Sequence, residues 1–130
     1  MHMSALTSHR ILLVDDHNIV REACSELLIE YGYEVDTAND GKDALDKMKA
    51  ASYDLVIIDI NMPMLNGIEL YKEVSSLYPN TKVKILFITG DISGEMDAFT
   101  FTMQNNNNIL KKPFIKDEFI DTVRRMLDKQ

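Results

Sequence analysis

Apolar runs of strand length alternate along the chain with stretches in which apolar residues recur every three or four positions. Short apolar runs are typical of strands, and the wider spacing is typical of amphipathic helices. The pattern predicts strands at residues 10–14, 33–37, 54–58, 83–89 and 108–111. It predicts helices at residues 20–31, 39–51, 66–77, 93–104 and 116–129.

Several element boundaries carry their own signals. Gly32 fits the C-terminal cap of the first helix, and Asn39 or Asp40 fits the N-cap of the second. The strand at 33–37 alternates apolar and polar residues, which is typical of an edge strand. The last helix should turn five apolar residues toward the core: Phe119, Ile120, Val123, Met126 and Leu127. The asparagine-rich segment 104–108 is predicted to be a loop.

Five strand–helix repeats predict an α/β domain with a parallel sheet covered by helices on both faces. The common strand order for such a doubly wound sheet is 2-1-3-4-5. A length of 130 residues fits one domain. We expect that domain at 9–130, with 1–8 either a disordered N-terminal segment or a remnant of cloning.

Charge and composition narrow the function classes. A net charge of −7 and a pI near 4.8 argue against binding of nucleic acid or an anionic membrane, but they permit a cation site. The single cysteine, Cys24, excludes an internal disulfide and favours a cytoplasmic setting. It falls on an apolar helical stripe, so it is expected to be a structural thiol. No apolar run approaches the roughly 20 residues of a transmembrane helix.

Carboxylates follow two of the predicted strands. Asp15 and Asp16 come directly after the first strand, and Asp59 comes after the third. In the 2-1-3-4-5 order these strands are neighbours at the point where strand order reverses, which is where ligands bind in open α/β sheets. Three carboxylates so close together need a raised pKa or a cation between them. Oxygen ligands of this kind suit Mg²⁺.

The fourth and fifth strands also end in reactive side chains. Thr89 is followed by Gly90, and Lys112 stands before Pro113. A carboxylate nucleophile, a divalent ion, a hydroxyl and a lysine form a constellation suited to phosphoryl transfer. Each residue alone has an ordinary explanation, such as a helix cap, a strand end or a solvated lysine. Their joint position at one sheet edge favours the functional interpretation.

These residues resemble the receiver domain of two-component response regulators, of the CheY-like kind, over Arg10 to about Leu127. The match includes the acidic pair, the D-x-N-M-P-x-x-x-G run from Asp59 to Gly67, Thr89-Gly90 and the Lys112-Pro113 pair. The resemblance implies a flavodoxin-like (βα)5 fold. It also implies that Asp59 accepts a phosphoryl group from a histidine kinase or a histidine phosphotransfer protein, in a Mg²⁺-dependent reaction, and that water later removes it.

The resemblance also assigns roles to the remaining site residues. Mg²⁺ would be held by Asp16, Asp59 and the backbone carbonyl of Asn61, with Asp15 acting through water. Lys112 would pair with the phosphoryl group, and Thr89 would hydrogen-bond to it. The domain would be a signalling phosphoacceptor rather than an enzyme, able to phosphorylate itself from small donors.

Two positions in this arrangement bear on how long the phosphoryl group lasts. In receivers, the residue two after the acceptor and the residue two after the threonine steer the attacking water. Here these are Asn61 and Asp91, which are polar and acidic. A moderate rate of self-dephosphorylation is expected from them.

Other positions depart from the receiver pattern or have a second interpretation. Ile109 stands where receivers usually carry Tyr or Phe, so the usual aromatic switch cannot operate in its common form. Phe101 would mark a docking surface if it is exposed. His17 is expected to start the first helix rather than to bind the metal, because Mg²⁺ prefers oxygen. Relatives often form a homodimer through the fourth helix, fifth strand and fifth helix, which stays possible here.

Two alternatives remain open. A pseudo-receiver would bind partners without being phosphorylated. A haloacid-dehalogenase-like phosphatase also uses an aspartate after an apolar strand, but it needs a second acid two positions later, where this chain has Asn61. Within the leading interpretation, the chain is either a stand-alone response regulator or a receiver cut from a hybrid kinase or a larger regulator.

Overall fold

A five-stranded parallel sheet forms the centre of the computed structural model, which describes residues 9–60, 72–73, 76, 84–89 and 108–128. The strands are β1 (Arg10–Val14), β2 (Glu34–Ala38), β3 (Leu55–Asp59), β4 (Lys84–Thr89) and β5 (Asn108–Lys111). Their order is β2-β1-β3-β4-β5. This confirms the predicted 2-1-3-4-5 sheet and places β2 at an edge.

The third strand ends one residue later than its apolar run suggests. Asp59 is the Cα partner of Ile88 in β4, and the Ile60 N–H donates to the Ile88 carbonyl at 2.9 Å. Pairing with β4 therefore extends the strand through the carboxylate. Asp59 lies inside the sheet ladder rather than in the turn after it.

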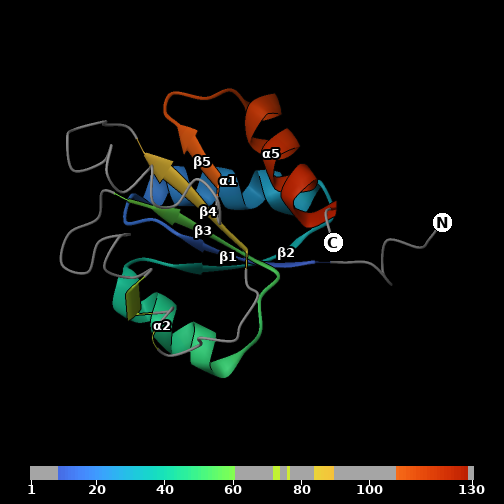
Figure 1. The fold of residues 1–130 in the computed structure, drawn as a ribbon. Coiled ribbons are helices and arrows are strands. Elements are labelled where there is room, and N and C mark those ends of the chain that lie inside the picture. Colours follow the sequence, from blue (N-terminus) through green and yellow to red (C-terminus); the bar gives the residue numbers. More distant parts are fainter. Residues whose placement is uncertain (1–8, 61–71, 74–75, 77–83, 90–107, 129–130) are drawn as a thin grey trace.

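The described helices lie on both faces of the sheet. Figure 1 shows α1 (Asn18–Glu30) and α5 (Lys116–Asp128) on one face and α2 (Gly41–Ala50) on the other. The Asp40 carboxylate caps α2 by accepting the Asp43 N–H, as the sequence suggests. Gly32, at φ 95°, directly follows the α1 C-cap Tyr31 and adopts a conformation that favours glycine. None of the described helices is long and apolar enough to span a membrane.

Two predicted helices fall largely outside the described residues. Of the expected helix at 66–77, residues 72, 73 and 76 are described, and all three are helical. The helix expected at 93–104 lies wholly outside the described ranges. So does the loop expected at 104–108, except for Asn108, which begins β5 as the predicted fifth strand does.

Alternate strand residues pack into two cores, one on each face of the sheet. On the α2 side, the buried residues include Leu12, Val14, Val56, Ile58, Ile85 and Phe87. On the α1 and α5 side they include Ile11, Leu13, Leu55, Ile57, Leu86 and Ile88, packed against Leu28 of α1. All five predicted core residues of the last helix are buried there. Because both faces of these strands are buried, the strand residues that line the two cores are apolar, which explains the continuous apolar runs in the sequence.

The apolar stripe of α1 is only partly covered. Leu28 is fully buried and Cys24 is half-buried, but Val20 and Tyr31 are 37% and 39% exposed. Ile19, next to Val20, is 84% exposed. The apolar spacing therefore predicted the helix correctly. The apolar side of the helix is wider than the part that the sheet and α5 bury. An apolar strip of α1 is left facing solvent.

A polar cluster ties β1 and β2 to the turn before β3. Arg10 forms an ion pair with Asp36 at 3.1 Å and lies over the Tyr53 ring, and the Tyr53 hydroxyl donates to Asp36 Oδ2 at 2.7 Å. Burial raises the pKa of Tyr53 to about 12 from 10.0, with help from the hydrogen bond and the negative charge of Asp36.

Replacing Tyr53 with phenylalanine should lower the free energy of unfolding by about 1 kcal/mol at neutral pH, since one hydrogen bond to a carboxylate is lost. Because the folded-state pKa is raised, this stabilisation is present below pH 10.0 and is lost as the pH rises toward 12. Denaturant unfolding of both proteins across this range measures the effect. A difference that stays constant up to pH 12 would contradict it.

Candidate functional site

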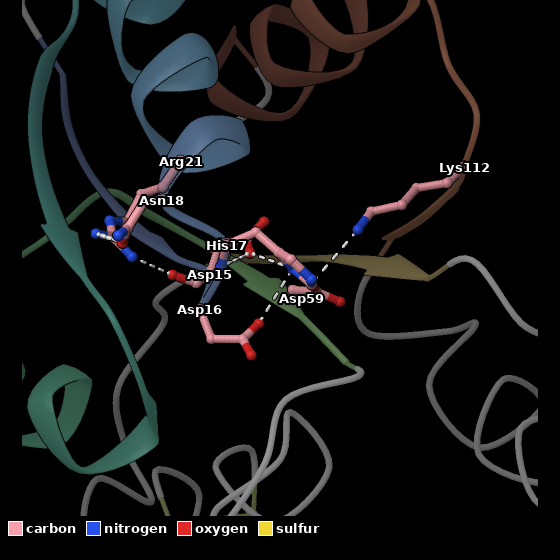
Figure 2. Close-up of polar contacts among 7 residues, drawn as sticks. All are labelled: Asp15, Asp16, His17, Asn18, Arg21, Asp59 and Lys112. Atoms are coloured by element: carbon pink, nitrogen blue, oxygen red, sulfur yellow. Dashed lines mark hydrogen bonds and ion pairs between the residues drawn. The ribbon is translucent and has the colours of Figure 1, made fainter.

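Three carboxylates meet at the carboxyl ends of β1 and β3. Asp15 directly follows β1 and Asp59 ends β3, and both are buried, with exposed fractions of 3% and 2%. One possible ligand atom from each of Asp15, Asp16, His17 and Asp59 lies within 4.8 Å of the others, as Figure 2 illustrates. The structure thus brings together Asp15, Asp16 and Asp59, as the strand order predicts.

The backbone around Asp15 is held from three directions. Its N–H donates to the Ala38 carbonyl of β2 at 3.1 Å, and its carboxylate Oδ1 accepts the His17 N–H at 2.8 Å. Its carbonyl accepts Nη1 of Arg21 at 2.7 Å, and the same guanidinium donates to Asn18 at 2.6 Å. The acidic doublet is therefore fixed to both β2 and α1.

Sequence reasoning did not single out Arg21. The sequence does contain a signal for it. Arg21 is a cation six residues after Asp15, in the first turns of the predicted helix, where it can reach back to the acidic doublet. Its guanidinium contacts the Asp15 backbone and not the carboxylate (Figure 2). Arg21 therefore orients the doublet without neutralising it.

Lys112 reaches the pocket from the other side. It follows β5, and its Nζ lies 3.3 Å from Asp59 Oδ2 (Figure 2). The lysine side chain is 31% exposed, whereas the carboxylate that it contacts is buried. Thr89 is the last residue of β4 and the Cα partner of Lys111, which puts its backbone at the same edge.

The oxygen atoms at this edge of the sheet fit a divalent cation. Asp16 Oδ1 is buried and accepts no hydrogen bond within the described part of the chain, although the His17 imidazole lies 3.3 Å from it as an ion-pair partner. A buried carboxylate oxygen that accepts no hydrogen bond gains from a cation beside it, either a protonated imidazole or a metal ion. Three converging carboxylates are the ligand type that a hard ion such as Mg²⁺ prefers. The residues present therefore could hold such an ion. Asn61, whose carbonyl was the fourth expected ligand, lies outside the described residues.

The charges of this site affect the pKa of the Cys24 thiol. Burial raises the pKa of its thiol, the negative charge of Asp15 raises it further, and the Lys112 ammonium partly opposes this. A thiol whose pKa is raised is mostly protonated and weakly nucleophilic at neutral pH. Partial burial and a raised pKa both agree with the structural role expected for Cys24.

His17 does more than start the helix. It is the N-cap residue of α1, but its side chain makes no capping hydrogen bond. Instead its Nδ1 lies 3.4 Å from Asp15 Oδ1 and 3.3 Å from Asp16 Oδ1. The expectation that His17 starts the helix is confirmed, and its imidazole in addition faces the carboxylates.

Ile109, at the position of the usual switch aromatic, is half-buried against the core on the α2 side. Its Cα partner in β4 is Phe87, which is fully buried. The aliphatic side chain thus packs beside a core aromatic. The other modulating positions named from the sequence, Asn61, Gly90, Asp91 and Phe101, lie outside the described ranges.

Comparison with known proteins agrees with this geometry. Residues 11–124 match the family model of the response regulator receiver domain. The chain is 31% identical to the chemotaxis protein CheY of Bacillus subtilis over 122 residues, which are 93% of this chain and 99% of CheY. It is 36% identical over 108 residues to the transcription factor SKN7 of Candida albicans; these are 83% of this chain but only 19% of SKN7, so it spans about a fifth of that relative.

A solved structure gives the same result. The response regulator TrrA of Thermotoga maritima, in complex with Mg²⁺ and BeF, superposes with a TM-score of 0.77 at 35% identity. The alignment covers 92% of this chain and 99% of TrrA. With a family model over most of its length, relatives above 30% identity and a matching fold, the chain belongs to the response regulator receiver domain family.

Proposed function

We propose that this receiver accepts a phosphoryl group on Asp59 from a histidine kinase or a histidine phosphotransfer protein. The observation that carries the proposal is the setting of Asp59, a buried carboxylate grouped with Asp15 and Asp16 and 3.3 Å from the Lys112 ammonium. A nucleophile in this position has a cation beside it and a metal-binding doublet opposite. No other described carboxylate has both.

Mg²⁺ is the proposed cofactor. Asp16, Asp59 and the Asn61 carbonyl would hold it, with Asp15 acting through water. When bound, the ion supplies charge that offsets the phosphoryl oxygens during transfer. The likeness to TrrA, which was solved with Mg²⁺ and BeF, supports this assignment.

The chain's own residues account for the transfer. An oxygen of Asp59 attacks phosphorus while the bond from phosphorus to the donor imidazole nitrogen breaks, and the imidazole leaves with the electron pair. Lys112 pairs with a phosphoryl oxygen, and the Thr89 hydroxyl donates to another. Water later attacks the aspartyl phosphate and releases inorganic phosphate. Asn61 and Asp91 are proposed to give this self-dephosphorylation a moderate rate.

The new charge is proposed to bias an existing conformational equilibrium of the segment after β4. Because Ile109 replaces the usual aromatic, the signal would pass through aliphatic packing beside Phe87 rather than through an aromatic rotamer. A homodimer through the fourth helix, β5 and α5 is one proposed readout. The strongly acidic domain is not proposed to bind nucleic acid itself.

The phosphodonor is proposed to dock on exposed apolar side chains near the starts of α1 and α5. Ile19 and Val20 of α1 are 84% and 37% exposed, and Ile115, just before α5, is 63% exposed. Both helices follow parallel strands and so begin at the same sheet edge as Asp59. Figure 1 shows them on one face of the sheet. Exposed apolar residues beside a reactive site are typical of a docking surface.

Replacing Ile19 with aspartate should therefore slow transfer from a phosphorylated histidine protein by about tenfold or more, because a hot-spot contact becomes a charge. Labelling by acetyl phosphate should not change, since this small donor needs no docking surface. Parallel time courses with both donors measure the effect. Ile29→Asp, at a site also 55% exposed but near the opposite end of α1, is the matched control. Equal loss with both donors would contradict the docking surface.

The proposed function is tested by incubating the protein with acetyl phosphate, with and without Mg²⁺, and measuring the intact mass. A gain of one phosphoryl group that needs Mg²⁺ supports the proposal. An unchanged mass under both conditions would favour the pseudo-receiver alternative. Sustained hydrolysis of phosphate esters would favour the phosphatase alternative.

A further inference from the structure

We propose that Phe114 is a positioning residue for phosphoryl transfer to Asp59. Its ring, stacked on Phe119 of α5, holds the chain that carries Lys112, so that the lysine ammonium stands beside the acceptor carboxylate. The inference rests on the proposed function and adds to it a residue that acts through Lys112.

The place of the Lys112 ammonium depends on where the backbone of this residue lies. A lysine side chain is a flexible four-carbon stem, and here 31% of it is exposed. Its Nζ lies 3.3 Å from Asp59 Oδ2, and Figure 2 shows it approaching from the side opposite the acidic doublet. A long, partly exposed stem has many rotamers. The backbone must therefore be held in place if the ammonium is to stand beside the carboxylate.

The chain is held on both sides of Lys112. On one side, Lys111 is the last residue of β5 and is paired with β4 in the sheet. On the other side, Phe114 stacks on Phe119, with ring centroids 5.5 Å apart and an angle of 20° between the ring planes. This geometry is typical of favourable aromatic pairs. Lys112 and Pro113 are the two residues between these anchors.

Phe119 gives the Phe114 ring a rigid support. Phe119 is fully buried near the start of α5, in the core that α1 and α5 form with the sheet, and Phe114 packs against the same core. Two hydrogen bonds fix the start of the helix beside the stack. The Ile115 N–H donates to Glu118 Oε1 at 3.1 Å, and the Phe119 N–H donates to the Ile115 carbonyl at 3.2 Å. Since a close-packed core moves little, the stack sets the position of the chain at Lys112.

A half-buried aromatic ring at the edge of a core also contributes to stability, and this contribution must be separated from positioning. The two effects differ in one measurable respect. A residue that acts through Lys112 has nothing left to position once the ammonium is removed, whereas a purely structural residue keeps its effect. A double-mutant cycle between Phe114 and Lys112 therefore distinguishes them.

Initial rates of labelling by acetyl phosphate at saturating Mg²⁺, corrected for the folded fraction, test the inference. Phe114→Leu keeps an apolar side chain but loses the stacked ring, so we expect labelling to be about tenfold slower. Phe114→Tyr keeps the ring and should be labelled within about twofold of the unaltered rate. Tyr33→Leu changes another partly buried aromatic residue, which packs against the same core just before β2. It is the matched control and should not slow labelling.

The double variant of Lys112→Met and Phe114→Leu gives the decisive comparison. Lys112→Met removes the ammonium but keeps a long side chain, and it should slow labelling by about tenfold or more. The double variant should then be labelled within about twofold of the rate of Lys112→Met alone. A further loss as large as that of Phe114→Leu by itself would overturn the inference, because Phe114 would then act on the fold and not through Lys112. Unaltered labelling of Phe114→Leu would also overturn it.

Failure of this inference and failure of the proposed function give different results. If the unaltered protein is not labelled, the proposed function is wrong, and the inference falls with it. If the unaltered protein is labelled and Lys112→Met is labelled equally fast, Asp59 remains the proposed acceptor. The inference alone is then wrong, because the reaction does not depend on the ammonium that Phe114 would position.

Discussion

Replacing Asp59 with alanine should abolish phosphorylation by acetyl phosphate, with labelling reduced more than about a hundredfold. The substitution removes the only described carboxylate that lies beside Lys112 in the pocket, and alanine offers no nucleophile in its place. Intact mass measured at saturating Mg²⁺ gives the result directly. Asp121→Ala, on the exposed face of α5, is the matched control and should be labelled like the unaltered protein.

Loss of labelling in the Asp59 variant must not reflect loss of folding. Asp59 is a buried charge grouped with two other carboxylates, so its removal relieves repulsion, which offsets the loss of its ion pair with Lys112 and should leave the metal-free protein folded. Denaturant unfolding without Mg²⁺ checks this. Persistent labelling in a folded Asp59→Ala variant would show that another residue is the phosphoacceptor.

Replacing Phe87 with alanine should lower the free energy of unfolding by about 3–5 kcal/mol. Phe87 is fully buried in β4, between neighbouring strands that place Ile58 and Ile109 beside it. Truncation leaves a cavity that the paired strands cannot close, because the ladder fixes their spacing. Urea unfolding monitored by circular dichroism measures the change.

The matched control is Phe87→Leu, which keeps most of the volume and should cost less than about 1.5 kcal/mol. Since Phe87 stands two residues before Thr89, the alanine variant should also slow labelling of whatever fraction stays folded. An alanine variant as stable as the leucine variant would show that the core on the α2 side collapses around the missing ring.

The parallel sheet followed from the sequence because two independent patterns agreed, and its strand order was predicted as the common one for such a sheet. Continuous apolar runs such as Leu55–Ile58 are typical of strands buried on both faces, and alternation with helices requires parallel crossovers. The acidic doublet and Asp59 then marked one edge of that sheet. Given the 2-1-3-4-5 order, their proximity is a consequence of topology and needs no knowledge of side-chain conformation.

The sequence could not predict how much of the apolar side of α1 is buried by the sheet and α5. Periodicity shows that Val20, Cys24 and Leu28 share one side of a helix, but it does not show how much of that side a neighbour covers. Val20 remains exposed while Leu28 is fully buried, because sheet and α5 meet only part of the stripe. Burial depends on how elements distant in sequence pack together, and no local pattern contains that information.

By itself, the sequence determined the class of fold, the strand order expected of it, and the carboxylates and lysine gathered at one edge. These depend on local periodicity and on the chemistry at strand ends. Only the tertiary structure decided that Asp59 belongs to the β3–β4 ladder, that Arg21 holds the Asp15 backbone and that His17 faces the doublet. The reason is physical: rotamers and contact distances are set by the packing of β1, β3, β5 and α1 against one another. Residues in contact there lie far apart in the chain, as Asp59 and Lys112 do at a separation of 53 positions.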